Sequence, residues 1–357
     1  MRAVWRISKI LIINILILFV LLVPIELLFG DWLCADSDID VPNARPNTLY
    51  VEPSPAYPSR RTITYSRDQY GFRGGSGEAA RIDVLAIGGS TTNDRYLDDA
   101  DTWIARLQRL LGDRDCRVTI ANAGIDGYST FGHIASFSRW FNRIPGLKPR
   151  FMLVYVGIND ALLEPTALPV EERPLSWWRR AEYYAAAHSA VRRLYMTVRG
   201  WWRARQGGVL HGEVPTAANA VWEPAPLPAD FTAMAARRTA AYRDRLERLG
   251  QLIRGFGSIP VYITQQRVDG RQVDDNWQQI TGSNGAIDTA ILLAIDRTTL
   301  DFCRDRGEVC IDLGGNLRFE RSDYYDAVHT TVSGSARIAD FLAGELAPIV
   351  CPPARRP

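Results

Sequence analysis

The hydrophobic positions of this chain form two kinds of pattern: short unbroken apolar runs and longer stretches with helical spacing. Five short runs have the composition of buried parallel strands, at residues 82–87, 118–121, 152–156, 260–264 and 309–313. Apolar residues recur at helical spacing in residues 103–111, 133–141, 234–253, 287–302 and 332–346. Strands that alternate with helices form right-handed β-α-β crossovers. The pattern predicts an α/β fold over residues 81–350, a three-layer α/β/α sandwich around a five-stranded parallel sheet.

A longer apolar run near the N-terminus has a different character. It covers residues 10–25, is interrupted only by Asn14 and Pro24, and resumes at Leu27-Leu28-Phe29 after Glu26. The whole stretch has about the length that crosses a bilayer. Basic residues precede the run and acidic residues follow it: Arg2, Arg6 and Lys9 before, Asp31, Asp36, Asp38 and Asp40 after. The positive-inside rule then predicts a single-pass anchor at residues 1–30 in a bacterial inner membrane, with the rest of the chain periplasmic. A cleaved signal peptide is the alternative, but no small-x-small cleavage site follows the run.

Two segments interrupt the α/β pattern. Residues 31–80 are rich in proline between positions 41 and 60, and we expect them to form an extended stalk and lead-in. Residues 165–228 form an insertion in which Trp177-Trp178 and Trp201-Trp202 bracket a helical stretch with many arginines. Three interpretations stay open for it: a helix packed on the domain, a lid over the site, or a contact with anionic lipid headgroups. Its end, residues 207–228, is expected to be a loop.

Composition narrows the class of protein. The chain is 46% hydrophobic and 23% charged, which suits a globular domain, and its net charge of +2 gives no sign of nucleic-acid binding. None of the five cysteines lies in a C-x-x-C motif, so neither a zinc site nor a redox motif is indicated. Cys303 and Cys310 are the nearest pair. They form either a disulfide, which an extracytoplasmic location permits, or two buried thiols.

Polar and small residues follow the first three predicted strands. They are Gly88-Gly89-Ser90-Thr91-Thr92, then Asn122-Ala123-Gly124, then Gly157-Ile158-Asn159-Asp160. The carboxyl ends of parallel strands meet at one edge of the sheet, so we expect these segments to converge on a site.

The segment Asp326-Ala-Val-His329 follows the fifth predicted strand and supplies acid–base chemistry. Asp326 can orient His329 through Nδ1, which leaves Nε2 free to take the proton of Ser90. The backbone N–H groups of Ser90 and Gly124 and the amide of Asn159 are candidate donors to an oxyanion.

The same segments have plainer interpretations. A phosphate-binding turn at Ser90 is disfavoured, because the lysine and the glycines of nucleotide-binding loops are missing. Asn122 and Asn159 can cap helices, and we assign Asp160 to capping the helix after the third strand. His133 lies in a helical run and is expected to be structural.

These four segments resemble the blocks of the SGNH, or GDSL-like, hydrolases. The resemblance covers roughly residues 81–346 without the insertion, and it implies a flavodoxin-like fold. It also implies Ser90 as nucleophile, Asp326 and His329 as its partners, and Gly124 and Asn159 as oxyanion donors. Gly89 stands where the family usually has aspartate, and the resulting G-G-S-T-T looks like that of membrane-anchored bacterial members. Many of these resemble enzymes that add or remove acyl groups on extracytoplasmic glycans.

The sequence therefore predicts a serine-dependent esterase that acts on ester-linked acyl groups, with an acylated small molecule or carbohydrate as substrate. No cofactor, metal or nucleic acid is expected. A glycan O-acyltransferase with the same triad is one alternative. A non-catalytic glycan-binding or assembly protein is the other, because a fold alone does not establish activity.

Overall fold

A computed structural model gives the fold of this chain. The structure describes residues 2–30, 44–54, 61–163 and 220–351, together with isolated positions between 32 and 57 and between 177 and 198. Contacts divide the chain into two compact units, which are described separately: Met1–Ser37 with Pro174–Gly208, and Asp38–Arg173 with Val209–Pro357.

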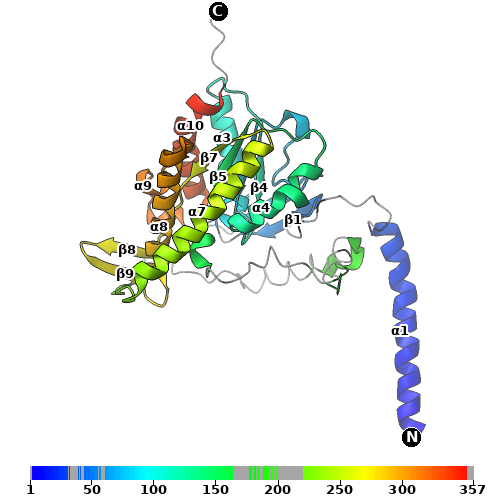
Figure 1. Cartoon of the computed structure of the whole chain (residues 1–357). Coiled ribbons are helices and arrows are strands. Elements are labelled where there is room, and N and C mark those ends of the chain that lie inside the picture. The colour runs from blue at the N-terminus through cyan, green and yellow to red at the C-terminus, as the bar shows by residue number, and fades with distance from the viewer. Residues whose placement is uncertain are drawn as a thin grey trace, which may run out of the picture. The chain divides into compact units, whose positions relative to one another are not determined.

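The second unit is built on a five-stranded parallel sheet (Figure 1). Its strands are β3 (Val84–Gly88), β4 (Ile120–Gly124), β5 (Phe151–Tyr155), β7 (Ile259–Ile263) and β10 (Val309–Ile311). Their order across the sheet is β10-β7-β5-β3-β4. This is the flavodoxin-like order, in which the first strand of the chain lies between the second and the third. The predicted α/β fold with five parallel strands is confirmed, and each strand lies within three residues of its predicted range.

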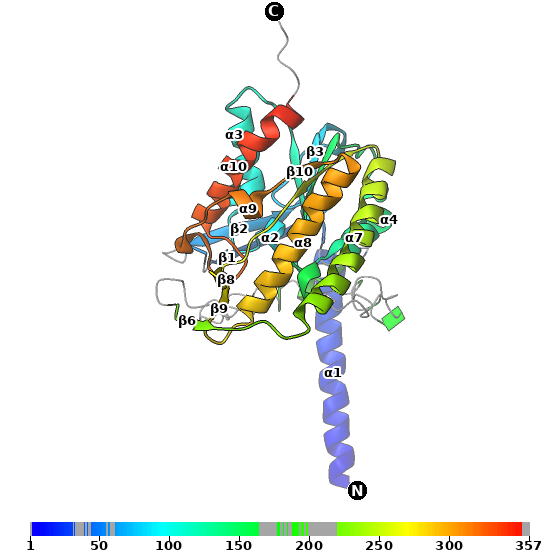
Figure 2. The ribbon, with the colours of Figure 1, turned by 60° about the vertical axis from the view of Figure 1, so that its left-hand side comes forward.

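Helices cover both faces of this sheet (Figure 2). On one side lie α4 (Thr130–Arg139), α7 (Phe231–Gly255) and α8 (Gly285–Arg306), which share a hydrophobic core with Leu85 and Ile87. On the other side lie α3 (Trp103–Gly112) and α10 (Val332–Val350), which pack against Val84 and Ala86. All five residues of β3 are buried because alternate side chains enter the two cores.

The segment expected to be a stalk folds onto this unit instead. It forms the antiparallel strands β1 (Thr48–Pro53) and β2 (Thr62–Arg67). Val41 and Ala44 lie in the main core, and Ile63 is buried with Leu97 in a smaller cluster. The backbone N–H of Arg73 donates to the carbonyl of Asn122 at 2.8 Å, which ties the segment to β4. The prediction of a stalk was wrong where the structure describes it. The many prolines suggested an extended stalk, but they say nothing about residues 62–67. In Thr62–Arg67 every second side chain is buried, as in a strand that packs on a domain.

A second sheet, absent from the prediction, lies on the C-terminal side of the insertion. It joins β6 (Trp222–Pro224), β9 (Asn276–Ile280) and β8 (Gly270–Val273) in an antiparallel arrangement. The residues before β8 support the D-x-x-H segment, because the N–H of Val268 donates to the carbonyl of Ala327 at 3.0 Å. The expected loop at 207–228 is therefore strand from Trp222 to Pro224, while residues 207–219 lie outside the described part of the chain.

Two disulfides fasten this unit. Cys303 is bonded to Cys310, which settles the two alternatives for this pair in favour of the bridge and ties the end of α8 to β10. Cys116 is bonded to Cys351, 235 residues further along the chain. This second bridge was not predicted, since spacing in the sequence gives no sign that the start of β4 and the end of α10 adjoin. It closes a long loop, the case in which cross-linking restricts the unfolded chain most.

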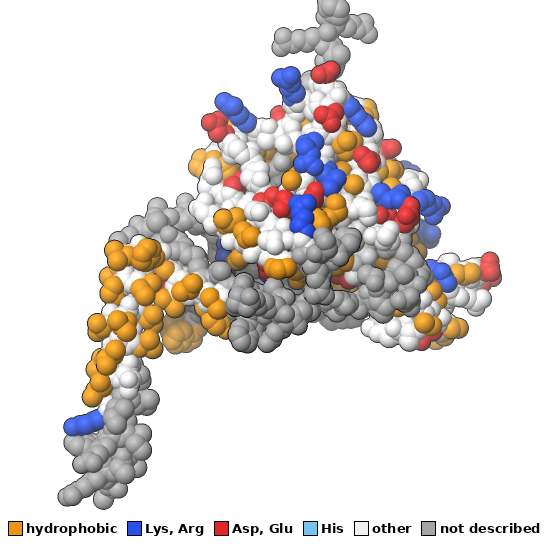
Figure 3. All heavy atoms as spheres, turned by 180° about the vertical axis from the view of Figure 1, so that it is seen from behind, with side chains coloured by type: hydrophobic (Ala, Val, Ile, Leu, Met, Phe, Trp, Pro, Cys, Tyr) orange, Lys and Arg blue, Asp and Glu red, His pale blue; other side chains and the backbone are white. Residues whose placement is uncertain are grey.

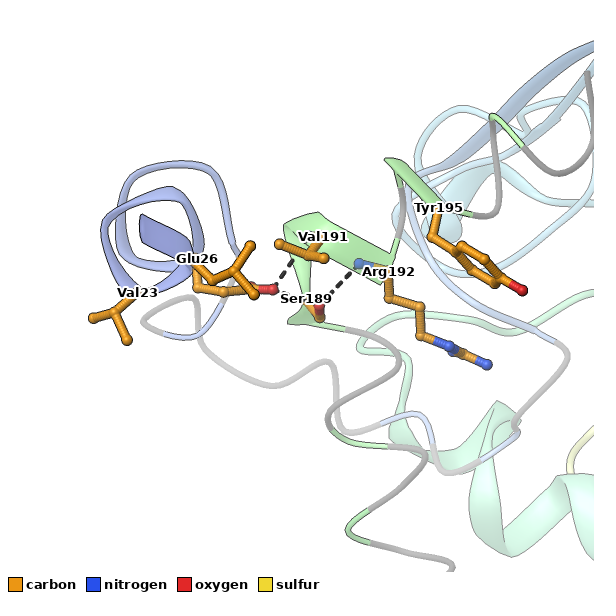
Figure 4. Close-up of a pocket in the computed structure, with 7 residues that line it drawn as sticks. Val23, Glu26, Ser189, Val191, Arg192 and Tyr195 are labelled. Carbon is orange, nitrogen blue, oxygen red and sulfur yellow. Dashed lines mark hydrogen bonds between the residues drawn. The ribbon is translucent and has the colours of Figure 1, made fainter. Parts of the chain in front are cut away.

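The first unit combines α1 (Arg2–Phe29) with residues of the insertion. Near the end of α1, the carboxylate of Glu26 accepts hydrogen bonds from Ser189 Oγ at 2.6 Å and from the N–H of Val191 at 3.2 Å (Figure 4). The helix carries many exposed apolar side chains (Figure 3). Across the described residues, no helix meets both the length and the hydropathy that a membrane span requires. In the insertion, Trp177 and Trp178 are exposed and their rings stack at 4.2 Å between centroids, whereas Trp201 and Trp202 lie outside the described residues.

Candidate active site

Ser90 lies at the point of the sheet where the strand order reverses. It follows β3, which has β4 on one side and β5 on the other. Ligands of open α/β sheets bind at this position, outside the carboxyl ends of the strands. Ser90 opens the short helix α2 (Ser90–Asn93), and Asn122 fixes that helix by donating from Nδ2 to the Thr92 carbonyl at 2.8 Å. Asn122 thus holds the serine segment rather than capping a helix.

Ser90, His329 and Asp326 form one continuous hydrogen-bonded series. The Oγ of Ser90 lies 2.7 Å from Nε2 of His329, and Nδ1 of His329 lies 2.6 Å from Oδ2 of Asp326. An ionised carboxylate only accepts, so Nδ1 carries the proton and Nε2 accepts from the serine hydroxyl. The structure brings together all three residues predicted for the triad, although they are separated by up to 239 positions in the sequence.

The aspartate is held in a geometry that keeps it ionised. Its Oδ1 accepts from the backbone N–H groups of Val328 at 2.9 Å and His329 at 2.7 Å. Burial alone would raise the pKa of Asp326, but the hydrogen bond and the charge of His329, together with these N–H groups, outweigh it and lower the pKa. The ring of Tyr325 stacks on the imidazole at 5.7 Å between centroids, which limits its rotation.

Asn159 lies beside the serine turn with part of its amide already fixed. Its Nδ2 donates to the carbonyl of Tyr128 at 2.8 Å, which uses one of the two amide hydrogens and orients the other. An added Cβ at Gly89 would lie only 2.5 Å from this Nδ2, so the amide is directly next to the residue that precedes Ser90. Asn159 is therefore placed as the sequence predicted for an oxyanion donor.

Gly124 is not available for the role predicted for it. Its N–H donates to Oδ1 of Asn122 at 2.9 Å, and its carbonyl accepts from Nη2 of Arg67 at 2.8 Å. The N–H and the carbonyl of Gly124 therefore both form hydrogen bonds inside the protein. The reason is that Gly124 is the last residue of the buried strand β4 and not part of the loop after it. The prediction for Gly124 was wrong for this reason.

The loop after β4 offers a better-placed N–H group. Residues 125–128 form a turn closed by the N–H of Tyr128 and the carbonyl of Ile125 at 3.1 Å. Gly127 has φ +77°, the value that the third position of a type II turn requires, and an added Cβ there would meet no atom within 4 Å. Among the described residues we find no hydrogen bond from the N–H of Gly127 or of Ser90. The Asp126-Gly127 pair is the turn signal that could have identified this residue from the sequence.

Gln265, just after β7, is a second residue that the sequence did not single out. Its Nε2 donates to Oγ1 of Thr91 at 2.9 Å, and its Oε1 accepts from the N–H of Ile158 at 2.8 Å. The side chain is buried and connects the serine helix with the loop that carries Asn159. A lone glutamine after a strand carries no motif, so only the tertiary structure shows this role.

Replacing Gly89 with alanine is expected to lower kcat by about 100-fold or more, with a smaller change in KM. The new methyl group would displace the Asn159 amide, and the loss of one oxyanion donor costs about that much in kcat. Steady-state kinetics on a chromogenic ester measure both constants. Gly112→Ala is the matched control, because a Cβ at that helical position meets no atom within 4 Å. Equal kcat values for the two variants would contradict the prediction.

Asp160 and His133 stabilise the structure around the site. Asp160 does not cap the turn that follows it; its carboxylate accepts from Thr130 Oγ1 at 2.6 Å, at the start of α4, and from Nη2 of Arg245 at 2.9 Å. This corrects its predicted role. His133 is buried in α4 with its ring edge against Tyr128, as expected for a structural residue. Desolvation by burial lowers the pKa of His133 to about 3.

His133 is expected to make folding stability fall in mild acid. Its folded pKa lies below that of the unfolded histidine, so the unfolded state binds the proton first as the pH drops. The contribution is constant above about pH 6.5, and the free energy of unfolding then falls by about 1.4 kcal/mol per pH unit toward pH 4. Urea unfolding of the wild type and of His133→Phe between pH 7 and pH 4 measures this slope. Identical slopes in the two proteins would contradict the prediction.

A parallel α/β sheet with a linked serine, histidine and aspartate at its carboxyl edge defines a serine hydrolase. Residues 86–337 match the GDSL-like Lipase/Acylhydrolase family, and this match covers more than half of the chain. The chain belongs to this family, whose hydrolases act on ester bonds.

Three relatives illustrate the similarity. The chain is 30% identical over 111 residues to Esterase TesA of Pseudomonas aeruginosa, a match that covers 29% of this chain and about half, 52%, of that protein. A crystal structure of TesA aligns over 74% of this chain and 98% of its own, with 15% identity and a TM-score of 0.42. A mutant of Axe2, an acetyl-xylooligosaccharide esterase from Geobacillus, aligns over 76% of this chain and 95% of its own, with 14% identity and a TM-score of 0.42.

Proposed function

We propose that this protein is a serine-dependent esterase that removes ester-linked acyl groups from an extracytoplasmic glycan. The observation that carries the proposal is the series from Ser90 Oγ through His329 to Asp326, with contacts of 2.7 and 2.6 Å. This series lowers the barrier to removal of the Ser90 proton, because His329 can accept that proton as a base.

The reaction proceeds in two halves. Ser90 Oγ bonds to the ester carbonyl carbon while its proton moves to Nε2 of His329, and Asp326 stabilises the resulting imidazolium. The carbon–oxygen bond to the alcohol then breaks, and His329 returns the proton to the departing alkoxide oxygen. Water repeats the sequence on the acyl-enzyme: its proton goes to His329, its oxygen bonds to the carbonyl carbon, and Ser90 recovers the proton as the acid leaves.

The developing oxyanion needs two or three fixed donors. We assign this role to the backbone N–H of Ser90, the free amide hydrogen of Asn159 and the N–H of Gly127. The last replaces Gly124, whose N–H already donates to Asn122. Donors that are fixed before the reaction cost no reorganisation when the charge develops.

The location and the substrate class are part of the proposal. The apolar run at residues 10–25, with its flanking charges, supports an anchor in a bacterial inner membrane and a periplasmic catalytic domain. The two disulfides support an oxidising compartment. The resemblance of G-G-S-T-T to membrane-anchored bacterial members supports a glycan ester as substrate, and acetylated oligosaccharides, the substrates named for Axe2, are the first compounds to test.

The full-length protein in detergent micelles tests the activity. We expect it to hydrolyse p-nitrophenyl acetate, to release acetate from an acetylated xylo-oligosaccharide, and to form a covalent adduct with a fluorophosphonate at Ser90. Added unacetylated sugar shows whether part of the acyl group passes to the acceptor, as in an O-acyltransferase. A wild-type protein that neither hydrolyses the ester nor reacts with the fluorophosphonate would contradict the proposal.

The location has its own test. Alkaline phosphatase fused to the C-terminus of the full chain is expected to be active in intact cells, because that enzyme matures only outside the cytoplasm. An inactive fusion, together with an active cytoplasmic reporter at the same position, would contradict the periplasmic assignment.

A further inference from the structure

Arg67 is a buried cation that reaches the site from outside the residues that match the family. It is the last residue of β2 and only 4% exposed. Its guanidinium donates to four oxygen atoms within 2.8 Å: Tyr65 Oη, the Gly71 carbonyl, Asn93 Oδ1 and the Gly124 carbonyl. The family match begins at residue 86, so the segment that carries Arg67 precedes it.

Two of these acceptors belong to the two segments that must face the same oxyanion. Asn93 is the last residue of α2, the helix that Ser90 opens, and Gly124 leads directly into the turn at 125–128. A single nitrogen, Nη2, donates to both, at 2.7 Å to Asn93 Oδ1 and at 2.8 Å to the Gly124 carbonyl. Arg67 therefore fixes the distance between the serine helix and the turn that presents Gly127.

The bridge extends further into the turn. Asn93 connects Arg67 to the 125–128 turn, because its Nδ2 donates to Oδ1 of Asp126 at 2.7 Å. The second branch runs through the Gly124 carbonyl, which accepts from Arg67 and belongs to the same peptide group as the N–H of Ile125. That N–H donates to the carbonyl of Gly88 at 2.9 Å. Gly88 lies two residues before Ser90. Both branches thus connect the guanidinium to residues that flank the reacting atoms.

The charge of this guanidinium is unusual for a buried group. All four of its acceptors are uncharged oxygens, whereas the neighbouring buried cation Arg73 forms an ion pair with Asp99. A buried charge that its contacts do not neutralise is costly to keep. In the low-dielectric interior it also favours a negative charge that develops nearby.

We propose that Arg67 is a positioning residue for the oxyanion donors. It holds the serine helix and the 125–128 turn in register so that the N–H groups of Ser90 and Gly127 converge on one point, and its charge favours the tetrahedral intermediate. The inference rests on the proposed esterase function. It gives Arg67, at the end of β2, a role in supporting the catalytic site.

Substitution of Arg67 in the full-length protein tests the proposal. We expect Arg67→Met to lower kcat by about 100-fold, the typical loss for one oxyanion donor, with KM changed by less than about threefold. Arg67→Lys keeps the charge but cannot donate in two directions from a rigid fork, so we expect an intermediate loss. The acid limb of the kcat profile is expected to keep its midpoint, because none of the triad contacts involves Arg67.

Tyr57→Phe is the matched control, because Tyr57 fastens the same segment to the domain at Asp101 without touching the site. We expect it to lose stability but to keep its kcat per folded molecule. A kcat of Arg67→Met within threefold of that of Tyr57→Phe, measured on folded protein, overturns the proposal. If Arg67→Met does not fold, a folded Arg67→Lys with wild-type kcat overturns it. A wild type without esterase activity overturns both the proposed function and this inference, whereas an active wild type with unaffected Arg67 variants overturns only the inference.

Discussion

Replacing Ser90 with alanine is expected to abolish ester hydrolysis, with a fall in kcat of about 10⁵- to 10⁶-fold. The Ser90 hydroxyl lies 2.7 Å from Nε2 of His329, and no water can take its place without losing the covalent intermediate. Residual activity over the uncatalysed rate is expected to come from the oxyanion donors alone. Initial rates with p-nitrophenyl acetate and fluorophosphonate labelling measure the effect, and the variant is expected to remain unlabelled.

The size of this loss distinguishes a nucleophile from a structural serine. Ser138→Ala is a suitable control, because Ser138 is an exposed serine of α4 that donates only to the carbonyl of Ala135. We expect the control to keep wild-type kcat, and both variants to have free energies of unfolding close to that of the wild type. A Ser90→Ala protein that retains more than a hundredth of the wild-type rate would mean that another group attacks the ester.

Replacing Asp326 with asparagine is expected to lower kcat by about 10⁴-fold with little change in shape. The single amide oxygen of asparagine would stay with the N–H groups of Val328 and His329, which now bind Oδ1. Its NH₂ group would then face Nδ1 and move the ring proton to Nε2. A protonated Nε2 cannot accept the hydroxyl proton of Ser90, so the base is lost although every heavy atom stays in place.

Kinetics across pH separate this effect from a general loss of structure. The lowered pKa of Asp326 keeps its carboxylate ionised at neutral pH. Stability from this depressed pKa is present above the unfolded pKa and disappears as the pH falls through the folded value. The stability difference between wild type and Asp326→Asn is therefore expected to be present at pH 7 and to vanish in strong acid. Asp340→Asn, at an exposed position of α10, is the control; equal kcat values for the two variants would rule out the assigned role.

The sheet and the triad were predictable because both depend on local patterns. Each parallel strand is a continuous apolar run, since β3 and its neighbours are buried on both faces. The carboxyl ends of parallel strands adjoin, so the sequence alone predicts that Ser90, Asn159 and His329 share one site. The D-x-x-H pair is also local, because Asp326 and His329 contact each other within one turn.

The features that were missed or mistaken depend on contacts between distant parts of the chain. Gly124 was assigned as a donor because it follows an apolar run, but β4 continues through Gly124, and the turn with the available N–H begins one residue later. Arg67 and Gln265 lie in segments without a motif. Their roles follow from partners 57 and 174 positions away, and sequence spacing gives no information about those partners.

The native disulfide pairing constrains the order in which the chain folds and its cysteines are oxidised. In the periplasmic location proposed above, Cys34 and Cys116 would emerge long before Cys351, with Cys303 and Cys310 between them. An oxidant that joins cysteines in order of appearance would link Cys34 to Cys116, whereas the native bond joins Cys116 to Cys351 and encloses the Cys303–Cys310 bridge. Correct maturation thus requires the sheet to assemble before Cys116 is oxidised, or a disulfide isomerase to repair the first pairing. If oxidation precedes folding of the sheet, export strains that lack such an isomerase are expected to give less correctly paired protein.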